Sequence, residues 1–313
     1  MLALCLEASH ARGMGHLFRG LALAQALENQ GGQVHFTLNA FAPAEALLRE
    51  RGRAFTTVDL AASGWEADII RTNGITTWIN DRLDTGAAHA QAVAGAGARL
   101  VTFDDRGPGA ALTDLNVVAF PASDDERLDG KRILSGPQAL VLDPAIATYR
   151  RPRTALNSLV VSMGGSDTYG VTVAVARALK QRGMNATVTL GPGFAHNEAL
   201  AAVAHDGLTV KRNVPSLVEE FAGHDLAITA GGLTPCEANA AGLPCIVIAT
   251  ESWEARTGQV LEGLGGSLFA GSRDQIDFGV LDRTLPIAAM SQAAMYGVPF
   301  DGARTIAGEI LAL

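Results

Sequence analysis

A short stretch near the start of the chain combines a glycine turn with side chains that can move protons or bind anions. Gly13, Gly15 and His16 follow an apolar run, in the order Gly-Met-Gly-His. Glycines permit a tight turn and a close approach of backbone to ligand, and the helix expected next offers N–H groups to an anion. The dipole of that helix disfavours imidazolium, so we expect His16 to be a neutral general base. The alternative is a histidine merely hydrogen-bonded at a helix start.

The same stretch differs from a dinucleotide-binding fingerprint. Phe18 stands where that fingerprint needs a third small residue, and the second expected strand, residues 33–38, does not end in a ribose-binding acid. Arg19 follows His16 by three residues and therefore lies on the same helix face. It either contacts an anionic substrate or packs as a surface or interdomain arginine.

A second glycine turn lies in the middle of the chain. Gly164 and Gly165 end an apolar run, and Ser166 and Asp167 precede an expected helix. Backbone amides and a hydroxyl in this order can cradle a phosphate. Ser166 or Asp167 can equally serve as a helix N-cap, and the two roles are compatible.

A third glycine turn follows another expected strand. Gly231 and Gly232 end that strand, and Leu233 and Thr234 open the next helix. Thr234 and Glu237 have the spacing of a capping box, which is one interpretation of Glu237. In the other, the Glu237 carboxylate accepts both hydroxyls of a ribose while the glycine turn beside it holds a diphosphate.

Acidic side chains end two strands expected in the first half. Asp81 closes the run 74–81, and Asp105 closes the run 98–105. Carboxylates at strand ends can bind sugar hydroxyls; the alternative is turn formation and mutual ion pairs. We predict Asp81 and Asp105 as substrate-binding residues, with both interpretations open.

The elements that must position these groups alternate between short apolar runs and helical periods. Such repeated β-α-β units predict parallel sheets covered by helices on both faces. A length of 313 residues suits two domains, and we read residues 143–157 as the linker, with a long loop inside one domain as the alternative. We therefore expect Rossmann-like domains over residues 1–148 and 149–313. The last helix, residues 302–313, can pack back on the first domain.

Composition and charge limit the classes of partner that we expect for this chain. The formal net charge is −8 and no basic block occurs, so we expect no nucleic acid or anionic membrane as partner. No apolar run reaches the roughly 18 residues of a membrane span. The three cysteines, Cys5, Cys236 and Cys245, are spread without a CxxC pair. This favours small buried residues in a reducing cytoplasm over disulfides or zinc.

Six segments occur in the order found in a known superfamily. The chain resembles GT-B proteins over nearly its whole length, in particular the UDP-sugar hydrolases of the pseudaminic-acid pathway and the related spore-coat polysaccharide proteins. The segments that carry this resemblance are GMGHLFRGLALAQAL, WINDRLDT, TFDDRGPGA, SMGGSD, ITAGGLTPCEANAAGLP and IATES.

The resemblance implies two Rossmann-like domains whose sheets face an interdomain cleft. It implies cleavage of a nucleotide-activated sugar at its anomeric carbon, without metal or cofactor. Uridine diphosphate would sit on the second domain, with its diphosphate at glycines 164–165 and 231–232 and its ribose at Glu237. His16 maps to the histidine thought to activate water, which would attack with inversion and release UDP.

Two departures from the family pattern bear on the substrate. Cys5 and Glu7 replace an Arg…Asp pair on the first strand, and Glu251-Ser252-Trp253 replaces Glu-Asn-Gln. Besides hydrolysis, the alternatives are glycosyl transfer with His16 deprotonating an acceptor, epimerisation, and non-catalytic binding of a nucleotide-sugar. The sequence leaves the sugar, any acceptor and the oligomeric state open.

Overall fold

The chain folds into two compact units, each built on one parallel sheet. The computed structural model describes residues 1–9, 14–62, 64–212 and 214–313. Unit 1 consists of Met1–Val141 together with Asp301–Leu313, and unit 2 of Leu142–Phe300. The division falls ahead of the expected boundary at 148/149.

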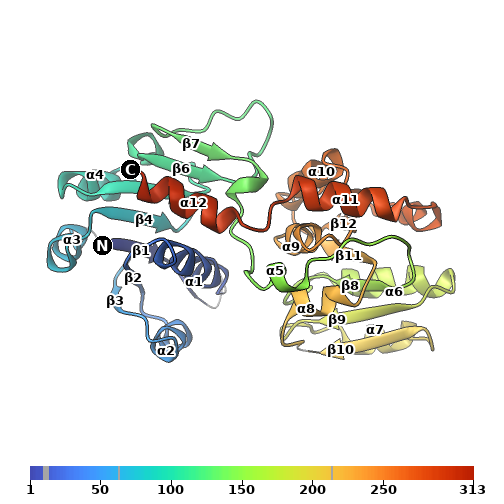
Figure 1. The fold of residues 1–313 in the computed structure, drawn as a ribbon. Helices are drawn as coiled ribbons and strands as arrows, with labels where there is room; N and C mark the ends of the chain where they lie inside the picture. The colour runs from blue at the N-terminus through green and yellow to red at the C-terminus, as the bar shows by residue number, and fades with distance from the viewer. Residues whose placement is uncertain (10–13, 63, 213) are drawn as a thin grey trace. The chain divides into compact units, whose positions relative to one another are not determined.

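The sheet of unit 1 has the strand order β3-β2-β1-β4-β5-β6-β7, with every pairing parallel (Figure 1). The order reverses between β1 and β4, and ligands of open α/β sheets bind at the carboxyl ends of the strands at such a switch point. The strands are β1 (Leu2–Leu6), β2 (Val34–Asn39), β3 (Phe55–Val58), β4 (Thr77–Asp81), β5 (Arg99–Phe103), β6 (Leu115–Val118) and β7 (Ile133–Ser135).

Alternation along the strands gives unit 1 a core on each face of its sheet. In β1, Leu2, Leu4 and Leu6 pack with α1, α2 and α12, whereas Ala3 and Cys5 pack with α3 and α4. A strand buried on both faces reads as a continuous apolar run, as β1 does. The helices are α1 (Gly15–Glu28), α2 (Ala42–Glu50), α3 (Glu66–Asn73), α4 (Ala87–Gly95) and α12 (Gly302–Leu311), with short 3-10 turns at Ala110–Leu112 and Pro137–Ala139.

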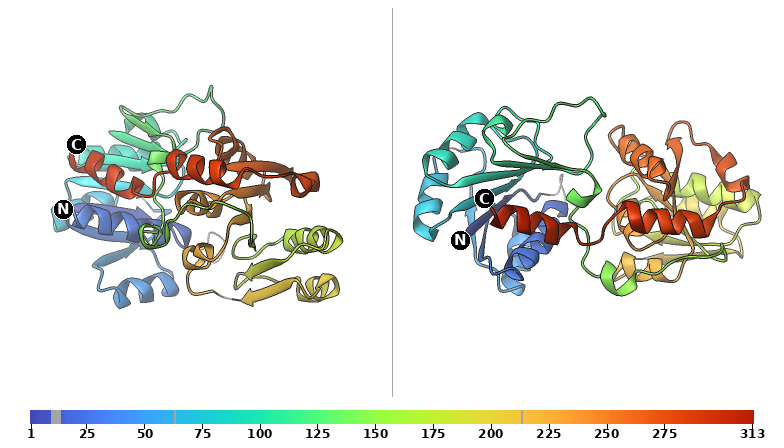
Figure 2. Two further views of the ribbon diagram at one scale, coloured as in Figure 1. Left: turned by 45° about the vertical axis from the view of Figure 1, so that its right-hand side comes forward. Right: turned by 45° about the horizontal axis from the view of Figure 1, so that its top comes forward.

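The last helix, α12, belongs to unit 1 although it ends the chain. Figures 1 and 2 show α12 alongside α1, where Ile306 and Ile310 are buried in the core of that unit. Gly302 permits α12 to approach the backbone after the 3-10 turn at Pro137–Ala139, because a Cβ there would lie 2.2 Å from the carbonyl oxygen of Leu140.

Unit 2 repeats the design with the strand order β10-β9-β8-β11-β12-β13, again all parallel, and its switch point lies between β8 and β11. Its strands are β8 (Leu159–Ser162), β9 (Ala186–Leu190), β10 (Leu208–Arg212), β11 (Leu226–Ala230), β12 (Cys245–Ala249) and β13 (Ser267–Ser272). Its helices are α5 (Ile146–Tyr149), α6 (Val171–Gln181), α7 (Asn197–Val203), α8 (Leu217–Ala222), α9 (Thr234–Ala240), α10 (Glu254–Gly263) and α11 (Ile287–Gly297), with a 3-10 turn at Phe278–Asp282.

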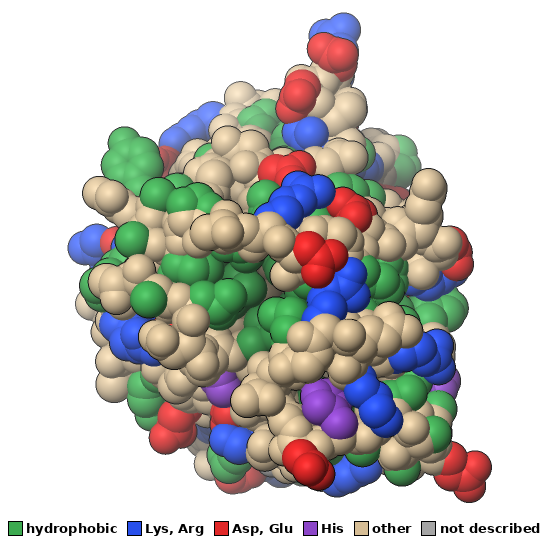
Figure 3. Space-filling view, turned by 90° about the vertical axis from the view of Figure 1, so that its right-hand side faces the viewer, with side chains coloured by type: hydrophobic (Ala, Val, Ile, Leu, Met, Phe, Trp, Pro, Cys, Tyr) green, Lys and Arg blue, Asp and Glu red, His purple; other side chains and the backbone are tan. Residues whose placement is uncertain are grey.

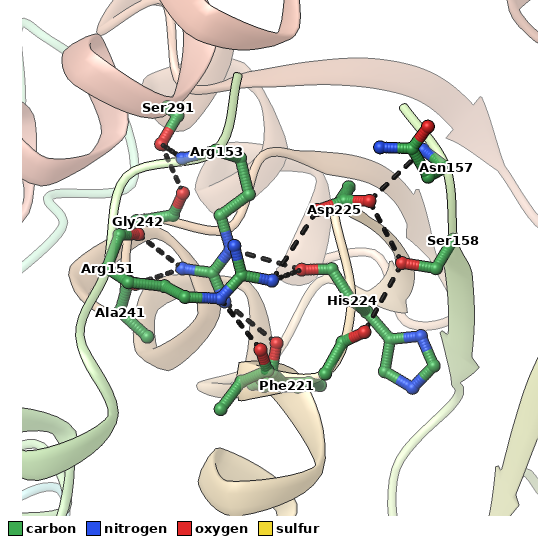
Figure 4. A network of polar contacts seen from close by, with 12 residues as sticks. Arg151, Arg153, Asn157, Ser158, Phe221, His224, Asp225, Ala241, Gly242 and Ser291 are labelled. Atoms are coloured by element: carbon green, nitrogen blue, oxygen red, sulfur yellow. Dashed lines mark hydrogen bonds and ion pairs between the residues drawn. The ribbon is translucent and has the colours of Figure 1, made fainter. Parts of the chain in front are cut away.

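Residues 143–157, which the sequence suggests as a linker, group with unit 2. Arg153 is 1% exposed, and its guanidinium donates to the carbonyl oxygens of Phe221 (2.8 Å), His224 (3.1 Å) and Ala241 (Figure 4). Two of these carbonyls close the helices α8 and α9, whose C-terminal dipole ends favour a cation. Burial and the neighbouring charge of Arg151 lower the pKa of Arg153 to about 10, so it remains charged at neutral pH.

The three cysteines are free and buried, as predicted. Within the described ranges, no three histidine, cysteine or acidic side chains gather as a metal site, and no helix has the length and apolarity needed to span a bilayer. Figure 3 shows basic and acidic side chains interspersed over the face that it presents.

Candidate functional site

His16 lies at the switch point of unit 1, in the first turn of α1. The helix begins at Gly15, and among the described residues no side chain caps it and no acid occupies its first turn. Asn39 fixes the chain leaving β1, because its side-chain amide exchanges two hydrogen bonds with the backbone of Ala8, of 3.0 and 2.8 Å. Gly13 lies outside the described residues. A Cβ on Gly15 would meet no atom of the described residues within 4 Å.

Asp81 and His16 form a hydrogen-bonded pair across the switch point. Asp81 is the last residue of β4, in register with Leu6 of β1, and its Oδ1 lies 2.7 Å from His16 Nδ1. The Asp81 side chain is 2% exposed and that of His16 16%. A carboxylate on Nδ1 selects the tautomer protonated there, which leaves the lone pair on Nε2 for a proton. The predicted base therefore has an orienting partner.

Arg19 completes this cluster through ion pairs. Its Nε donates to Asp81 Oδ2 at 2.8 Å, one Nη donates to Asp81 Oδ1, and the other donates to Asp104 Oδ2 at 2.8 Å. The guanidinium also lies 5.3 Å from the centre of the Phe103 ring. Burial opposes ionisation of Asp81, but the charge of Arg19 and the hydrogen bonds from His16 and Arg19 outweigh it and lower the pKa of Asp81. Arg19, predicted to contact substrate, is engaged by these two carboxylates.

The acidic pair after β5 divides into two roles. Asp104 has a φ of 52°, a left-handed conformation that Asp tolerates better than most residues, and its carboxylate faces Arg19. Asp105 is 1% exposed, and its Oδ1 accepts from the backbone N–H groups of Thr85 and Gly107, both at 2.9 Å. The Asp105 side chain thus joins the loop after β4 to the loop after β5. This arrangement agrees with the alternative of turn formation. Asp104 acts on the cluster, although the sequence singled out its neighbour.

In unit 2, the turn after β8 has an open glycine pair ahead of α6. Gly164 has a φ of 80°, and a Cβ on Gly164 or Gly165 would meet no atom of the described residues within 4 Å. Asp167 is 6% exposed and accepts from the N–H groups of Val171 and Thr172 of α6, both at 2.8 Å. Neither Ser166 nor Asp167 is the N-cap residue, which is Gly170; Asp167 instead accepts from the first N–H groups of α6 from three residues before that position. Ser166 is exposed, and its Oγ lies 3.2 Å from Thr168 Oγ1.

The turn after β11 is fixed by a hydrogen bond to Glu254, a residue that the sequence analysis did not single out. Glu254, 6% exposed at the start of α10, accepts from the N–H groups of Gly231 (3.3 Å) and Thr250 (2.7 Å) with its Oε2. A Cβ on Gly231 would lie 2.7 Å from the Cβ of Glu254, so glycine is required for this approach. Only the three-dimensional structure joins these loops, since Glu254 follows β12 and one of its donors, Gly231 N, follows β11.

The capping box predicted at Thr234 and Glu237 does not form. Helix α9 starts at Thr234 itself, with Leu233 at the N-cap and no side-chain cap among the described residues. Glu237 lies in the first turn, where burial and the nearby Asp143 carboxylate raise its pKa to about 7. A partly buried carboxyl without a capping role is free to serve as a ligand-binding group.

The fold is that of the GT-B class. The chain matches MurG of Acinetobacter baumannii over 100% of its length and 99% of that chain, with a TM-score of 0.74 and 15% identity. It matches the spinosyn rhamnosyltransferase SpnG complexed with thymidine diphosphate (99% and 100% covered, TM-score 0.61, 15% identity). It also matches UGT2 of Phytolacca americana complexed with UDP-2-fluoro-glucose and pterostilbene (100% of this chain and 94% of that chain covered, TM-score 0.59, 10% identity). The predicted fold class, two Rossmann-like domains of GT-B type, is confirmed.

Among curated proteins, the chain is similar to the spore coat polysaccharide biosynthesis protein SpsG of Bacillus subtilis. The two are 24% identical over 283 residues, which cover 85% of this chain and 82% of SpsG. It is also 24% identical over 271 residues to the uncharacterized protein MJ1062 of Methanocaldococcus jannaschii, covering 79% of this chain and 55% of the relative, so it spans about half of that protein. No protein-family model matches. The resemblance to SpsG-like GT-B proteins drawn from the motifs is thus confirmed.

Proposed function

We propose that the chain is a GT-B enzyme that cleaves the anomeric bond of a UDP-sugar by hydrolysis in surface-polysaccharide or nonulosonic-acid biosynthesis. The His16–Asp81 pair at the switch point of unit 1 is the observation that carries this proposal. The names of SpsG and of the glycosyltransferase neighbours support a nucleotide-sugar reaction.

In the proposed reaction, His16 Nε2 removes a proton from a water molecule. The water oxygen forms a bond to C1 of the sugar while the bond from C1 to the diphosphate oxygen breaks on the opposite face, so the configuration inverts. UDP departs with the electron pair of the broken bond. Asp81, kept ionised by Arg19, stabilises the imidazolium until its proton passes to solvent.

Unit 2 is proposed to hold the UDP. Asp167 occupies N–H groups in the first turn of α6, so the diphosphate would be bound by the backbone of the turns at 164–165 and 231–232. These donors stabilise the charge that develops on the leaving group, which removes the need for a strong general acid. Glu237 would accept the ribose hydroxyls once it has lost its proton.

Glycosyl transfer is the second candidate, and the similarity to the rhamnosyltransferase SpnG favours it. Phe18 is 56% exposed on α1 and Leu83 is 39% exposed after β4, and exposed apolar side chains offer surface to an acceptor. In that reaction His16 would deprotonate an acceptor hydroxyl, with the same cleavage at C1.

The test is UDP release from a panel of UDP-sugars, with and without sugar, peptide or lipid acceptors. Hydrolysis predicts UDP without acceptor, and transfer predicts UDP only when an acceptor is present. His16→Ala should abolish turnover and keep UDP binding, while Glu237→Ala should abolish UDP binding. Full turnover by His16→Ala would refute the assignment of the base and favour a non-catalytic role for that residue.

A further inference from the structure

Three large apolar side chains are exposed at the carboxyl ends of neighbouring strands of unit 2. Trp253 is 65% exposed after β12, Tyr169 is 47% exposed after β8, and Leu233 is 44% exposed after β11. These three strands are adjacent in the sheet. Large apolar groups gathered on a surface mark binding sites. We therefore expect this edge of the sheet to bind a ligand that has an apolar face.

The loop that carries Trp253 is fixed to the glycine turn after β11. Its neighbour Glu254 accepts from Thr250 N at 2.7 Å, Thr250 Oγ1 at 2.9 Å and Glu251 N at 3.2 Å. The same carboxylate oxygen accepts from Gly231 N at 3.3 Å. The loop 250–253 and the turn that would bind a diphosphate therefore form one hydrogen-bonded structure, which holds Trp253 in place beside that turn.

Glu251 is oriented in the same loop by groups on two other elements. Tyr169 Oη donates to Glu251 Oε1 at 2.9 Å, and Arg273 Nη1 lies 3.7 Å from Glu251 Oε2. Arg273 stacks on the Tyr169 ring, 3.6 Å from its centre, and donates to the Thr250 carbonyl oxygen. The carboxylate, 45% exposed, is thus held in one orientation and still has lone pairs for further hydroxyls.

An exposed indole beside an oriented carboxylate suits a pyranose ring. The C–H groups on one face of a pyranose carry partial positive charge, and the face of an aromatic ring is negative. A carboxylate beside the ring can accept two hydroxyls at the pyranose rim. A diphosphate bound at the turn 231–232 carries a ribose on one side, near Glu237, and the transferred sugar on the other.

We propose that Trp253 and Glu251 form the recognition site for the sugar of the nucleotide-sugar, with the Trp253 indole stacked on the C–H face of a hexopyranosyl group. This inference rests on the proposed function and specifies its substrate class. Trp253 is then a specificity-determining residue, and the loss of its ring weakens binding of the sugar without weakening binding of the nucleotide.

The experiment compares binding of UDP with binding of UDP-glucose, UDP-galactose and UDP-N-acetylglucosamine by calorimetry. His16→Ala serves as the background that blocks turnover. Trp253→Ala should weaken the best UDP-sugar about tenfold, equivalent to about 1.4 kcal/mol, and leave UDP unchanged; Trp253→Phe should restore most of the affinity. Tyr296→Ala is the matched control, since Tyr296 is a 91% exposed aromatic of the same unit on α11, and should change neither ligand.

Intrinsic fluorescence gives an independent measurement, because Trp253 is one of only three tryptophans in the chain. The UDP-sugar, and not UDP, should change the emission of Trp253 and leave that of Trp253→Phe unaltered. Equal weakening of UDP and UDP-sugar by Trp253→Ala would place the indole on the nucleotide and overturn the proposal, as would unchanged affinity for both. Absence of UDP binding by the parent protein would instead refute the proposed function.

Discussion

Replacing Asp81 by Asn tests the general base most directly, because the amide keeps the shape of the side chain and removes its charge. Asp81 bonds His16 Nδ1 at 2.7 Å and Arg19 Nε at 2.8 Å from a 2% exposed position. Burial alone would favour the neutral acid, yet the charge of Arg19 and the hydrogen bonds to Asp81 hold its pKa below the usual range. The carboxylate is therefore ionised at neutral pH beside the imidazole that becomes charged in the reaction.

The size of the expected loss in kcat follows from the charged hydrogen bond that the Asn amide cannot make. A hydrogen bond to a charged group contributes about 1.5–3 kcal/mol, which corresponds to about 10- to 150-fold in rate. The Asn amide can also present its N–H₂ to Nδ1 and select the tautomer with the proton on Nε2, which cannot act as the base. In the serine-protease triad, the equivalent change costs about 10⁴-fold in kcat. We expect Asp81→Asn to lower kcat by about 10²- to 10⁴-fold and leave the affinity for UDP unchanged.

Asp104→Asn is the matched control for this experiment. Asp104 is the other carboxylate partner of Arg19, at 2.8 Å, and Asn tolerates its left-handed φ of 52°. Each variant leaves Arg19 with one carboxylate, so thermal unfolding should show comparable losses of stability. UDP release at saturating UDP-sugar should fall less than about tenfold in Asp104→Asn. Equal losses of kcat in the two variants would refute the dyad and leave only a structural role for the cluster.

Three further predictions concern unit 2. Because the pKa of Glu237 is raised from 4.5 to about 7, the folded state keeps a proton that the unfolded chain loses, so stability falls as pH rises from about 4.5 to about 7 and levels off above that value. Glu237→Gln should therefore raise the thermal midpoint at pH 8 and not at pH 5, while weakening UDP at least tenfold, and wild-type UDP affinity should fall below pH 7. Gly231→Ala, whose Cβ would lie 2.7 Å from that of Glu254, should weaken UDP by displacing the turn, as titration calorimetry can measure. Arg153→Met leaves several buried carbonyls without a donor and should lower the free energy of unfolding in urea by about 3 kcal/mol or more.

The alternation of strands and helices was accessible from the sequence because hydrophobic periodicity reports local structure. Runs such as residues 2–6 and 245–249 are apolar throughout, since both faces of a parallel strand are buried. The same reasoning interpreted segment 143–157 as a linker, because two prolines and a basic run are typical of a linker. Whether Arg153 points into solvent or onto the carbonyls of distant helix ends depends on tertiary packing.

The site was accessible residue by residue but not as an arrangement. His16 could be singled out by its helix-start position, yet its pairing with Asp81, 65 residues away, depends on β4 lying next to β1. Strand order is a long-range property that periodicity does not contain. Glu254 was missed for the same reason, since the N–H groups that donate to it follow two different strands, β11 and β12. The Thr234–Glu237 spacing matched a capping box, and a helix start shifted by one residue was enough to remove that cap.

The two switch points solve different chemical problems with the same topology. In unit 1, side chains dominate: Arg19 keeps Asp81 ionised, and Asp81 in turn sets the tautomer of His16, so the arrangement is suited to moving a proton. In unit 2, carboxylates that could repel a diphosphate are instead directed onto the backbone: Asp167 accepts from the first N–H groups of α6, and Glu254 accepts from N–H groups of the loops after β11 and β12. Both acids rigidify a turn while their charge is satisfied by N–H groups. A glycine turn by itself therefore indicates little about function, and the proposed roles rest on where the neighbouring acids point: at His16 in unit 1, and at backbone N–H groups in unit 2.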